Sequence, residues 1–246
     1  MSAQWIMDAR PPETPLTRAL SQRFLGWEIH AETDCFDTDV VELMDFRGSS
    51  DQLHFFYVLP YGPRHALVES TLLSPCSQQH DYEAELCDYL QQRYGVTQHY
   101  QVYQQHSCLN LRLPLPSVFG AGIAPPGRTA GTLRPSTGFA LLETISDAKR
   151  IAQCFVSVAT GVASISAFCR DVVDLQRDKI FFDGLSADWK RGPEHFMALF
   201  EGLGAETLVA FLAGRPEFSQ RLRVAMQLPK LDFLRAAGRH ALKEVS

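Results

Sequence analysis

The residue with the clearest chemical potential is Glu69, an acid within an otherwise apolar, strand-like segment at residues 66–72. Because side chains of a strand alternate between two faces, Glu69 is expected to share a face with Leu67 and Thr71. If that face is the interior, burial disfavours the carboxylate and raises its pKa. A carboxylic acid that stays protonated in an apolar pocket is a proton donor. The alternative is a solvent-facing glutamate on an edge strand.

A second candidate is the charged pair Asp45 and Arg47, two residues apart in the segment Met44-Asp45-Phe46-Arg47. Side chains two residues apart on a strand point to the same face, so the two members of this pair are expected to lie together. It could line a pocket, or it could be a surface ion pair that contributes little to stability.

The third candidate is a loop at residues 127–139, which is rich in glycine and precedes a predicted helix. Glycine lets the backbone approach a ligand closely, and the free amides at a helix start favour electron-rich groups. A proline-rich connector between elements explains the composition equally well.

Other catalytic signatures are absent from the sequence: there is no GxGxxG after a strand, no GxxxxGK[ST], no HExxH and no GxSxG. His54 and His65 could face each other across a predicted hairpin, although unrelated surface or core histidines are the expected interpretation. None of the six cysteines forms a CxxC pair, and no cysteine pair has metal-ligand spacing, so we expect no metal site and reduced thiols in a cytoplasmic protein.

The elements that must position these residues are mainly strands in the first half of the chain. Strand-like segments are expected at residues 4–10, 24–30, 40–46, 53–60, 65–72 and 100–113, with an amphipathic helix over 81–94 that Gly95 ends. Four of these strands are expected to form an antiparallel meander. The second half is helical from Leu141 onward, with breaks near Gly184, Gly192-Pro193 and Gly214-Arg215-Pro216.

Composition and charge limit the class of protein. The chain has 246 residues, 46% of them hydrophobic and 21% charged, which fits a globular protein and excludes disorder. A net charge of −5 argues against a nucleic-acid binder. The uncharged run at residues 151–169 is too polar for a membrane span, and we expect a buried or interfacial helix there.

Several blocks in this order closely resemble the flavin-dependent lycopene β-cyclases of bacteria. They are FLGWEI (24–29), LMDFR (43–47), FFYVLP (55–60), ALVESTLLS (66–74) and GRTAGTLRPSTGF (127–139). Each block alone is weak, but together they are specific, and the resemblance covers nearly the whole chain.

The resemblance implies an α+β flavoprotein related to the glutathione-reductase type, in which only a remnant of the FAD-binding fold is present. It has an antiparallel-sheet substrate region (1–115), a flavin-facing loop and helix start (116–150) and a helical C-terminal region (151–246). The implied enzyme is an isomerase that protonates the acyclic ends of lycopene and closes each into a β-ionone ring. It uses FAD that NAD(P)H keeps reduced.

The resemblance also implies roles for individual residues. Glu69 matches a proposed acid/base group, and Asp45 and Arg47 lie in the MDFR block. The residues implied to lie beside the flavin are Ala130, Gly131, Pro135, Ser136, Thr137, Gly138 and Phe139. The physical requirements agree, because a carbocation needs a dry pocket and aromatic faces, which Trp27, Phe55, Phe56 and Tyr57 could supply.

The chain also departs from the family pattern. Family members begin with a strand, a glycine-rich turn and a helix that hold the ADP half of FAD, whereas this sequence starts with what resembles the end of that region. A family acid pair is Gln104-Gln105 here, Ser107 replaces a glycine, and Phe139 replaces a tyrosine. We therefore expect a truncated chain whose full activity would need the missing nucleotide-binding part.

Two further interpretations stay open: a non-catalytic relative that binds a carotenoid or another long apolar ligand, and a fragment of a flavoprotein hydroxylase. Because lycopene dissolves in membranes, peripheral membrane contact is expected. Candidate contacts are residues 196–200 and 208–212, although core helices explain these segments as well.

Overall fold

The structure is a computed structural model of the chain, and it describes residues 6–7, 20–47, 52–75, 80–111, 123–124, 132–134, 136, 138–159, 172–214 and 216–228. The chain divides into two compact units. The sheet unit comprises Leu16–Asn110, and the helical unit comprises Met1–Pro15 together with Leu111–Ser246. The predicted division of the chain at residues 115 and 150 stays a prediction.

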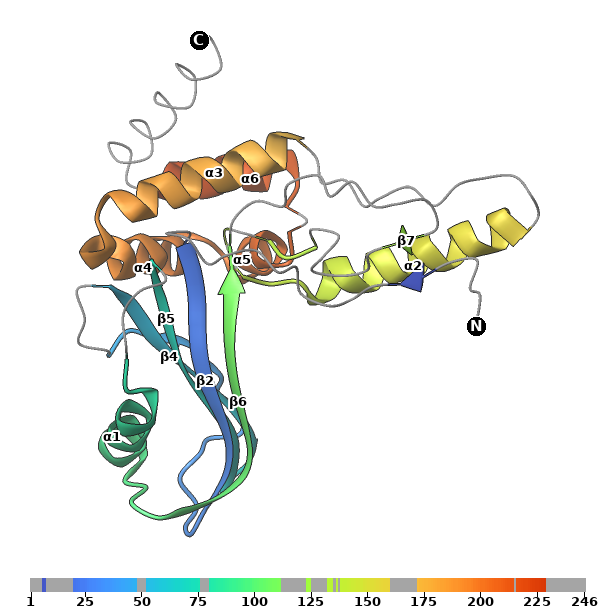
Figure 1. Cartoon of the computed structure of the whole chain (residues 1–246). Coiled ribbons are helices and arrows are strands. Elements are labelled where there is room, and N and C mark those ends of the chain that lie inside the picture. The colour runs from blue at the N-terminus through green and yellow to red at the C-terminus, as the bar shows by residue number, and fades with distance from the viewer. Residues whose placement is uncertain are drawn as a thin grey trace. The chain divides into compact units, whose positions relative to one another are not determined.

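The sheet unit is built on five antiparallel strands in the spatial order β3-β4-β5-β2-β6 (Figure 1). Their bounds are β2 Leu20–Ala31, β3 Glu42–Asp45, β4 Leu53–Gly62, β5 His65–Pro75 and β6 His99–Asn110. The predicted strands are present, but the predicted meander is wrong in one respect. β2 lies between β5 and β6 and not beside β3, and in that place the backbone groups on both edges of β2 find hydrogen-bond partners.

The predicted amphipathic helix is α1, Tyr82–Tyr94. The side chain of Asp81 caps its N-terminus by accepting from the backbone N–H of Ala84 at 3.1 Å. Gly95 ends it with φ 70°, a left-handed conformation that glycine adopts without strain. Both ends of the helix are therefore fixed by the sequence.

One face of the sheet and the apolar face of α1 form the core of this unit. Even-numbered β5 residues from Ala66 to Leu72 point toward α1, whose buried side chains are Tyr82, Leu86, Tyr89 and Leu90. Phe56 stacks on the ring of Tyr89 with a centroid distance of 3.9 Å. The odd-numbered β5 residues, Glu69 among them, therefore lie on the opposite face of the sheet.

The helical unit contains five α-helices among its described residues, together with a short parallel pairing of β1 (Ile6–Met7) with β7 (Ile123–Ala124). The helices are α2 Leu141–Ala159, α3 Val172–Ala187, α4 Gly192–Gly202, α5 Ala205–Leu212 and α6 Phe218–Gln227, with a 3-10 turn, η2, at Trp189–Arg191. The predicted break near Gly184 is wrong, because α3 runs through it, whereas helices do begin at Gly192 and end before Gly214.

The expected buried or interfacial helix at residues 151–169 is described only in its first part. Within α2, Ile151 is buried and Val156 is exposed, and residues 160–171 lie outside the described part of the chain. None of the helices among the described residues is both long and apolar enough to cross a bilayer.

Candidate functional site

Glu69 lies near the middle of β5 on the sheet face opposite α1. Its side chain is half-buried, and the hydroxyl of Thr71 donates a hydrogen bond to Oε1 at 2.5 Å. Burial raises the pKa of the Glu69 carboxyl above its ordinary value, and the hydrogen bond from Thr71 only partly opposes this effect. The side chain thus has the environment of a carboxylic acid that holds its proton more tightly than a free glutamate does.

A cross-strand row places three residues beside Glu69. Tyr57 of β4 and Gly26 of β2 are its direct partners, and Gln105 of β6 is the partner of Gly26. Directly opposed residues share a face, so these four positions lie in one line across the sheet. A Cβ at Gly26 would lie 3.7 Å from Oε2 of Glu69, so the glycine leaves open the space over which the carboxyl extends.

Aromatic rings flank this row on the same face. Phe55, two residues from Tyr57, is only 2% exposed, and their rings meet edge-on at 5.1 Å. Phe46 contacts Phe55 edge-on at 5.9 Å. Burial, together with the charge of Glu69, raises the pKa of Tyr57, which keeps its phenol protonated. The acid therefore lies beside a largely buried, aromatic part of the sheet.

The other two predicted aromatic faces are not part of this surface. Phe56 and Trp27 alternate to the opposite face, where both are buried in the core against α1. Their place follows from the strand period, since each is adjacent in sequence to a residue of the Glu69 row.

The structure brings Asp45 and Arg47 together but not with Glu69. Arg47 Nε lies 2.8 Å from Oδ2 of Asp45. The same carboxyl accepts a hydrogen bond from the hydroxyl of Tyr89 at 3.0 Å and lies 3.9 Å from Arg93 Nε, both on α1. Asp45 pairs with Phe56, so it lies on the α1 face of the sheet. The described contacts make the pair a link between β3 and α1, and its predicted catalytic role stays a prediction.

The predicted flavin-facing loop is described in part. Gly138 has φ 71°, and its N–H donates to the carbonyl of Arg134 at 2.8 Å, which closes a tight turn before α2. Ser136 is 6% exposed, and its Oγ has no hydrogen-bond partner among the described residues. Four of the predicted cofactor-binding residues lie outside the described part of the chain: Ala130, Gly131, Pro135 and Thr137.

Arg134 fixes this loop within the helical unit. Its guanidinium lies over the ring of Phe211 at 4.8 Å and 3.5 Å from Oδ1 of Asp178 in α3, and its Nη1 donates to the carbonyl of Phe211. The loop is therefore held by a charged side chain that is itself mostly buried.

A cavity of about 290 Å³ lies beside this loop, between the start of α2 and the end of α5. Its lining is mostly apolar and consists of Arg134, Phe139, Ala140, Leu141, Leu142, Glu143, Val209, Leu212, Ala213 and Gly214. Phe139, one of the residues predicted to lie beside the flavin, thus lines this cavity.

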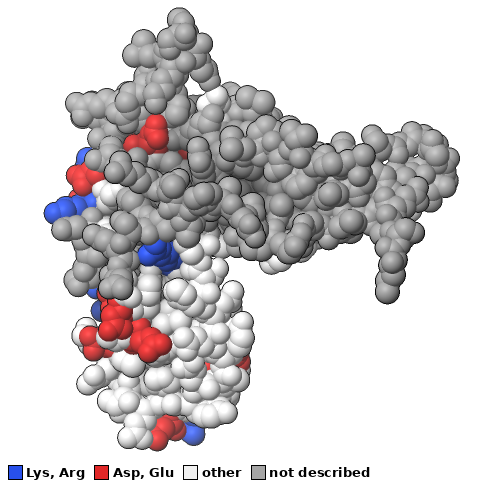
Figure 2. All heavy atoms as spheres, in the orientation of Figure 1, with Lys and Arg blue, Asp and Glu red and all other residues white. Residues whose placement is uncertain are grey.

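The segments predicted to contact a membrane are divided between core and surface. Phe196, Leu199 and Phe211 are buried, whereas Met197 and Val209 are exposed. Figure 2 shows that uncharged residues make up most of the visible described surface of the sheet unit, with acidic side chains at its edges.

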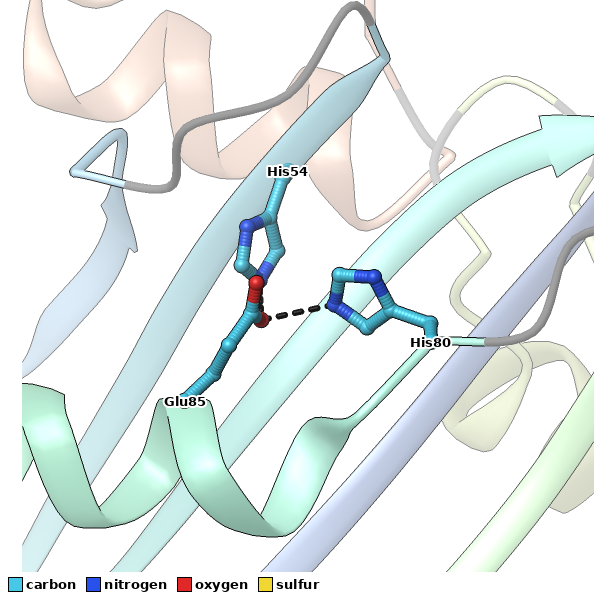
Figure 3. A group of neighbouring side chains, drawn as sticks. All are labelled: His54, His80 and Glu85. Carbon is cyan, nitrogen blue, oxygen red and sulfur yellow. Dashed lines mark hydrogen bonds and ion pairs between the residues drawn. The ribbon is translucent and has the colours of Figure 1, made fainter.

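A further cluster was not predicted. His54 of β4, His80 and Glu85 of α1 meet on the α1 face of the sheet (Figure 3). His54 and His65 do not face each other, in agreement with the expected interpretation: His54 is opposite Leu72, whereas His65 stacks on His30 and hydrogen-bonds Glu28. The only sequence signal of this cluster was His80, directly before the helix cap Asp81, with Glu85 in the first turn of the helix.

The fold is similar to that of proteins with solved structures. A geranylgeranyl bacteriochlorophyll reductase-like protein from Thermoplasma acidophilum is similar over 90% of this chain and 55% of its own length, at 14% identity and a TM-score of 0.52. A myxobacterial chondrochloren halogenase, a variant of the FAD-dependent halogenases, covers 94% of this chain at 16% identity, with 64% of its own length matched and a TM-score of 0.41. The chain spans about half the length of the first of these proteins.

The sequence itself identifies the family. No curated protein matches the chain. The family model described as lycopene cyclase protein matches residues 1–238, almost the entire sequence. The chain therefore belongs to the lycopene cyclase family.

Proposed function

We propose that this chain provides the proton donor of a lycopene β-cyclase-like isomerase, with Glu69 as the acid. The observation that carries the proposal is the half-buried Glu69 carboxyl, whose pKa is raised by burial and which lies beside aromatic rings. The proton adds to the terminal double bond of lycopene, a neighbouring double bond captures the cation, and loss of a proton yields the β-ionone ring. The atoms balance, and no net redox change occurs.

The hydrogen bond at Glu69 indicates which oxygen carries the proton. Oε1 accepts the hydroxyl hydrogen of Thr71, so the acidic proton belongs on Oε2. A Cβ at Gly26 would lie 3.7 Å from Oε2, so the glycine leaves room beside this oxygen. Thr71 and Gly26 would thus orient and expose the proton, and a general acid fixed in this way contributes about 10²–10⁴-fold to a rate.

The aromatic neighbours suit the intermediate. A carbocation is stabilised by the negative face of an aromatic ring, and Phe55, Tyr57 and Phe46 lie together near the acid. The phenol of Tyr57 stays protonated, so it adds no anion that would take up the proton of Glu69. The buried ring of Phe55, flanked by the partly buried rings of Tyr57 and Phe46, would help to keep water from capturing the cation.

The cofactor that we propose is FAD, kept reduced by NAD(P)H. The described residues fit such a group, because Ser136 presents a buried hydroxyl without a described partner and Gly138 lets the backbone approach a ligand closely. When bound, reduced FAD supplies an electron-rich ring system. Phe139, at the rim of the apolar cavity, would contact apolar ligand atoms on this side of the loop.

The substrate class implies where the protein acts. Lycopene is a hydrocarbon that dissolves in membranes, so we propose a cytoplasmic protein in peripheral contact with the membrane. The exposed apolar residues Met197 and Val209 are candidates for that contact.

One observation favours a second candidate, a non-catalytic protein that binds a carotenoid. Gln105 is the direct neighbour of Gly26 and thus lies two strands from Glu69 in the same row, and the family's acid pair is replaced at Gln104-Gln105. A glutamine keeps the shape of the acid but cannot exchange a proton in the same way. Loss of the family's acid pair would impair ring closure but leave carotenoid binding intact.

Pigment analysis separates the two candidates. The chain is expressed in a lycopene-accumulating host, with and without any coding sequence upstream of residue 1, and its carotenoids are extracted and identified. The cyclase proposal expects β-carotene at the expense of lycopene in at least one arm. Protein that purifies with bound carotenoid while the host's lycopene stays acyclic in both arms would establish the binding candidate instead.

A further inference from the structure

The α1 face of the sheet carries a cluster of metal-type ligands that is separate from the Glu69 site. Nε2 of His80 lies 2.7 Å and Nε2 of His54 lies 3.0 Å from the same oxygen, Oε2 of Glu85 (Figure 3). One ligand atom from each of the three residues fits within 4.8 Å of the other two.

The chemistry of this set matches a transition-metal site. Two imidazole nitrogens and one carboxylate oxygen form a ligand set that zinc uses, with a fourth position left for water. Two ligands bound tetrahedrally at 2.0–2.1 Å lie about 3.3 Å apart. The two nitrogen–oxygen separations differ from this value by less than about an ångström, and all three ligand atoms lie within 4.8 Å of one another, so side-chain rotations suffice to place them around one ion.

Three elements supply the ligands. His54 comes from β4, His80 from the residue before the helix cap Asp81, and Glu85 from the first turn of α1. The side chain of His54 is 1% exposed, whereas those of His80 and Glu85 are 16% and 27% exposed. The site therefore has a rigid, buried base and a partly open side through which an ion and a water molecule can enter.

The surroundings hold the ligands in place. The hydroxyl of Ser70 lies 2.9 Å from Nε2 of His54 and 3.4 Å from Oε2 of Glu85, and the rings of Phe56 and Tyr82 contact the two imidazoles. These contacts fix the ring planes before any ion binds, which reduces the entropy lost on coordination.

We propose that His54, His80 and Glu85 bind one divalent transition-metal ion of the zinc class, which fastens the N-terminus of α1 to the sheet. The proposal is independent of the cyclisation chemistry, since the Glu69 row lies on the opposite face. A metal-bound imidazole coordinates through an unprotonated nitrogen, so binding competes with protons and weakens as the pH falls.

The test is titration of the purified, metal-stripped chain with Zn²⁺ by calorimetry, with Co²⁺ absorption as a second readout of nitrogen and oxygen ligation. The expected result is one equivalent of Zn²⁺ bound and a rise in Tm, whereas Mg²⁺, which prefers oxygen ligands, has neither effect. His80→Ala and Glu85→Gln are each expected to weaken Zn²⁺ binding by about 100-fold or more, at least as much as loss of a supporting outer ligand does.

The matched control is His30→Ala, which removes an exposed imidazole at the far end of β2, about 20 Å along the strands from His54. It should leave Zn²⁺ affinity unchanged. Circular dichroism establishes that each variant is folded, and two separate ligand variants ensure that one unfolded protein does not decide the outcome. Absence of Zn²⁺ binding to the unaltered chain, or equal binding by all the variants, would overturn the proposal and leave a hydrogen-bonded cluster.

Discussion

The two faces of the five-stranded sheet shift the pKa of a glutamate carboxyl in opposite directions. On the α1 face, burial alone would raise the pKa of Glu85, but hydrogen bonds and charge interactions with His54 and then His80 outweigh it and lower the pKa. On the other face, Glu69 has one hydrogen bond, from a neutral hydroxyl, and burial raises its pKa. The identity of the partner, two imidazoles or one threonine hydroxyl, decides whether the pKa of the buried carboxyl is lowered or raised.

The same contrast appears in how each face is built. The α1 face is a packed core of stacked rings, linked by ion pairs such as Arg93 with Glu42 at 2.8 Å. The opposite face carries a glycine at its centre and a line of residues suited to contact a ligand. One sheet thus separates the ion-paired polar groups of the core from the acid that we propose as proton donor, and mutations on the two faces should differ in kind.

The largest effect is expected from Glu69→Gln in an active form of the enzyme. Glutamine keeps the shape and the contact with Thr71 but has no acidic proton, so ring closure should fall by about 10²–10⁴-fold. The measurement is β-carotene yield in a lycopene-accumulating host. Glu28→Gln is the matched control, because Glu28 lies on the same face of the sheet two residues from Gly26 and is held by His65. Unchanged β-carotene yield in Glu69→Gln would remove the proposed acid.

A substitution in the α1 face should act on stability instead. Phe56→Ala removes a ring that is 4% exposed and stacked on Tyr89, so the free energy of unfolding should fall by about 3–5 kcal/mol. Urea unfolding followed by circular dichroism measures this change. Tyr103→Ala, at a position 55% exposed on the edge strand β6, should stay within about 0.5 kcal/mol of the unaltered chain. Similar losses in both variants would mean that the α1 face is not the core of the unit.

The sequence predicted the local parts of this arrangement and missed the pairings between distant elements. Strand alternation placed Glu69 with Thr71, and the cap residue Asp81 with Gly95 located α1, because both signals lie within a few residues. The place of β2 between β5 and β6 could not be read from any local period. The register of β3 against β4 also shifts between Glu42 and Asp45, so strand alternation alone could not predict the face on which Asp45 lies.

The candidate sites show the same limit. The shared face of Tyr57, Glu69, Gly26 and Gln105 depends on the register of four strands, and the His54–Glu85 contact joins a strand to a helix. Neither arrangement has a fixed spacing in sequence, unlike the motifs that usually reveal metal or nucleotide sites. The resemblance to the cyclase family supplied the role of Glu69, whereas the histidine cluster required the structure.

The smallest expected effect is a pH dependence of stability that belongs to Glu69. Since its pKa is raised on folding, the folded state binds the proton more tightly than the unfolded state. This contribution to stability is therefore complete below the unfolded pKa near 4.5 and is lost as the pH rises through the higher folded pKa. Each unit of pKa difference corresponds to about 1.4 kcal/mol.

The free energy of unfolding of Glu69→Gln should therefore increase relative to that of the unaltered chain as the pH rises, since glutamine has no charge to bury. Urea unfolding of both proteins between pH 4 and pH 8 measures the difference, and Glu28→Gln shows how far removal of any carboxyl from this face shifts the curve. If the curves of Glu69→Gln and the unaltered chain stay parallel, Glu69 does not titrate differently in the folded state. A difference that shrinks with rising pH would mean that the pKa of Glu69 is lowered on folding, as that of Glu85 is on the other face.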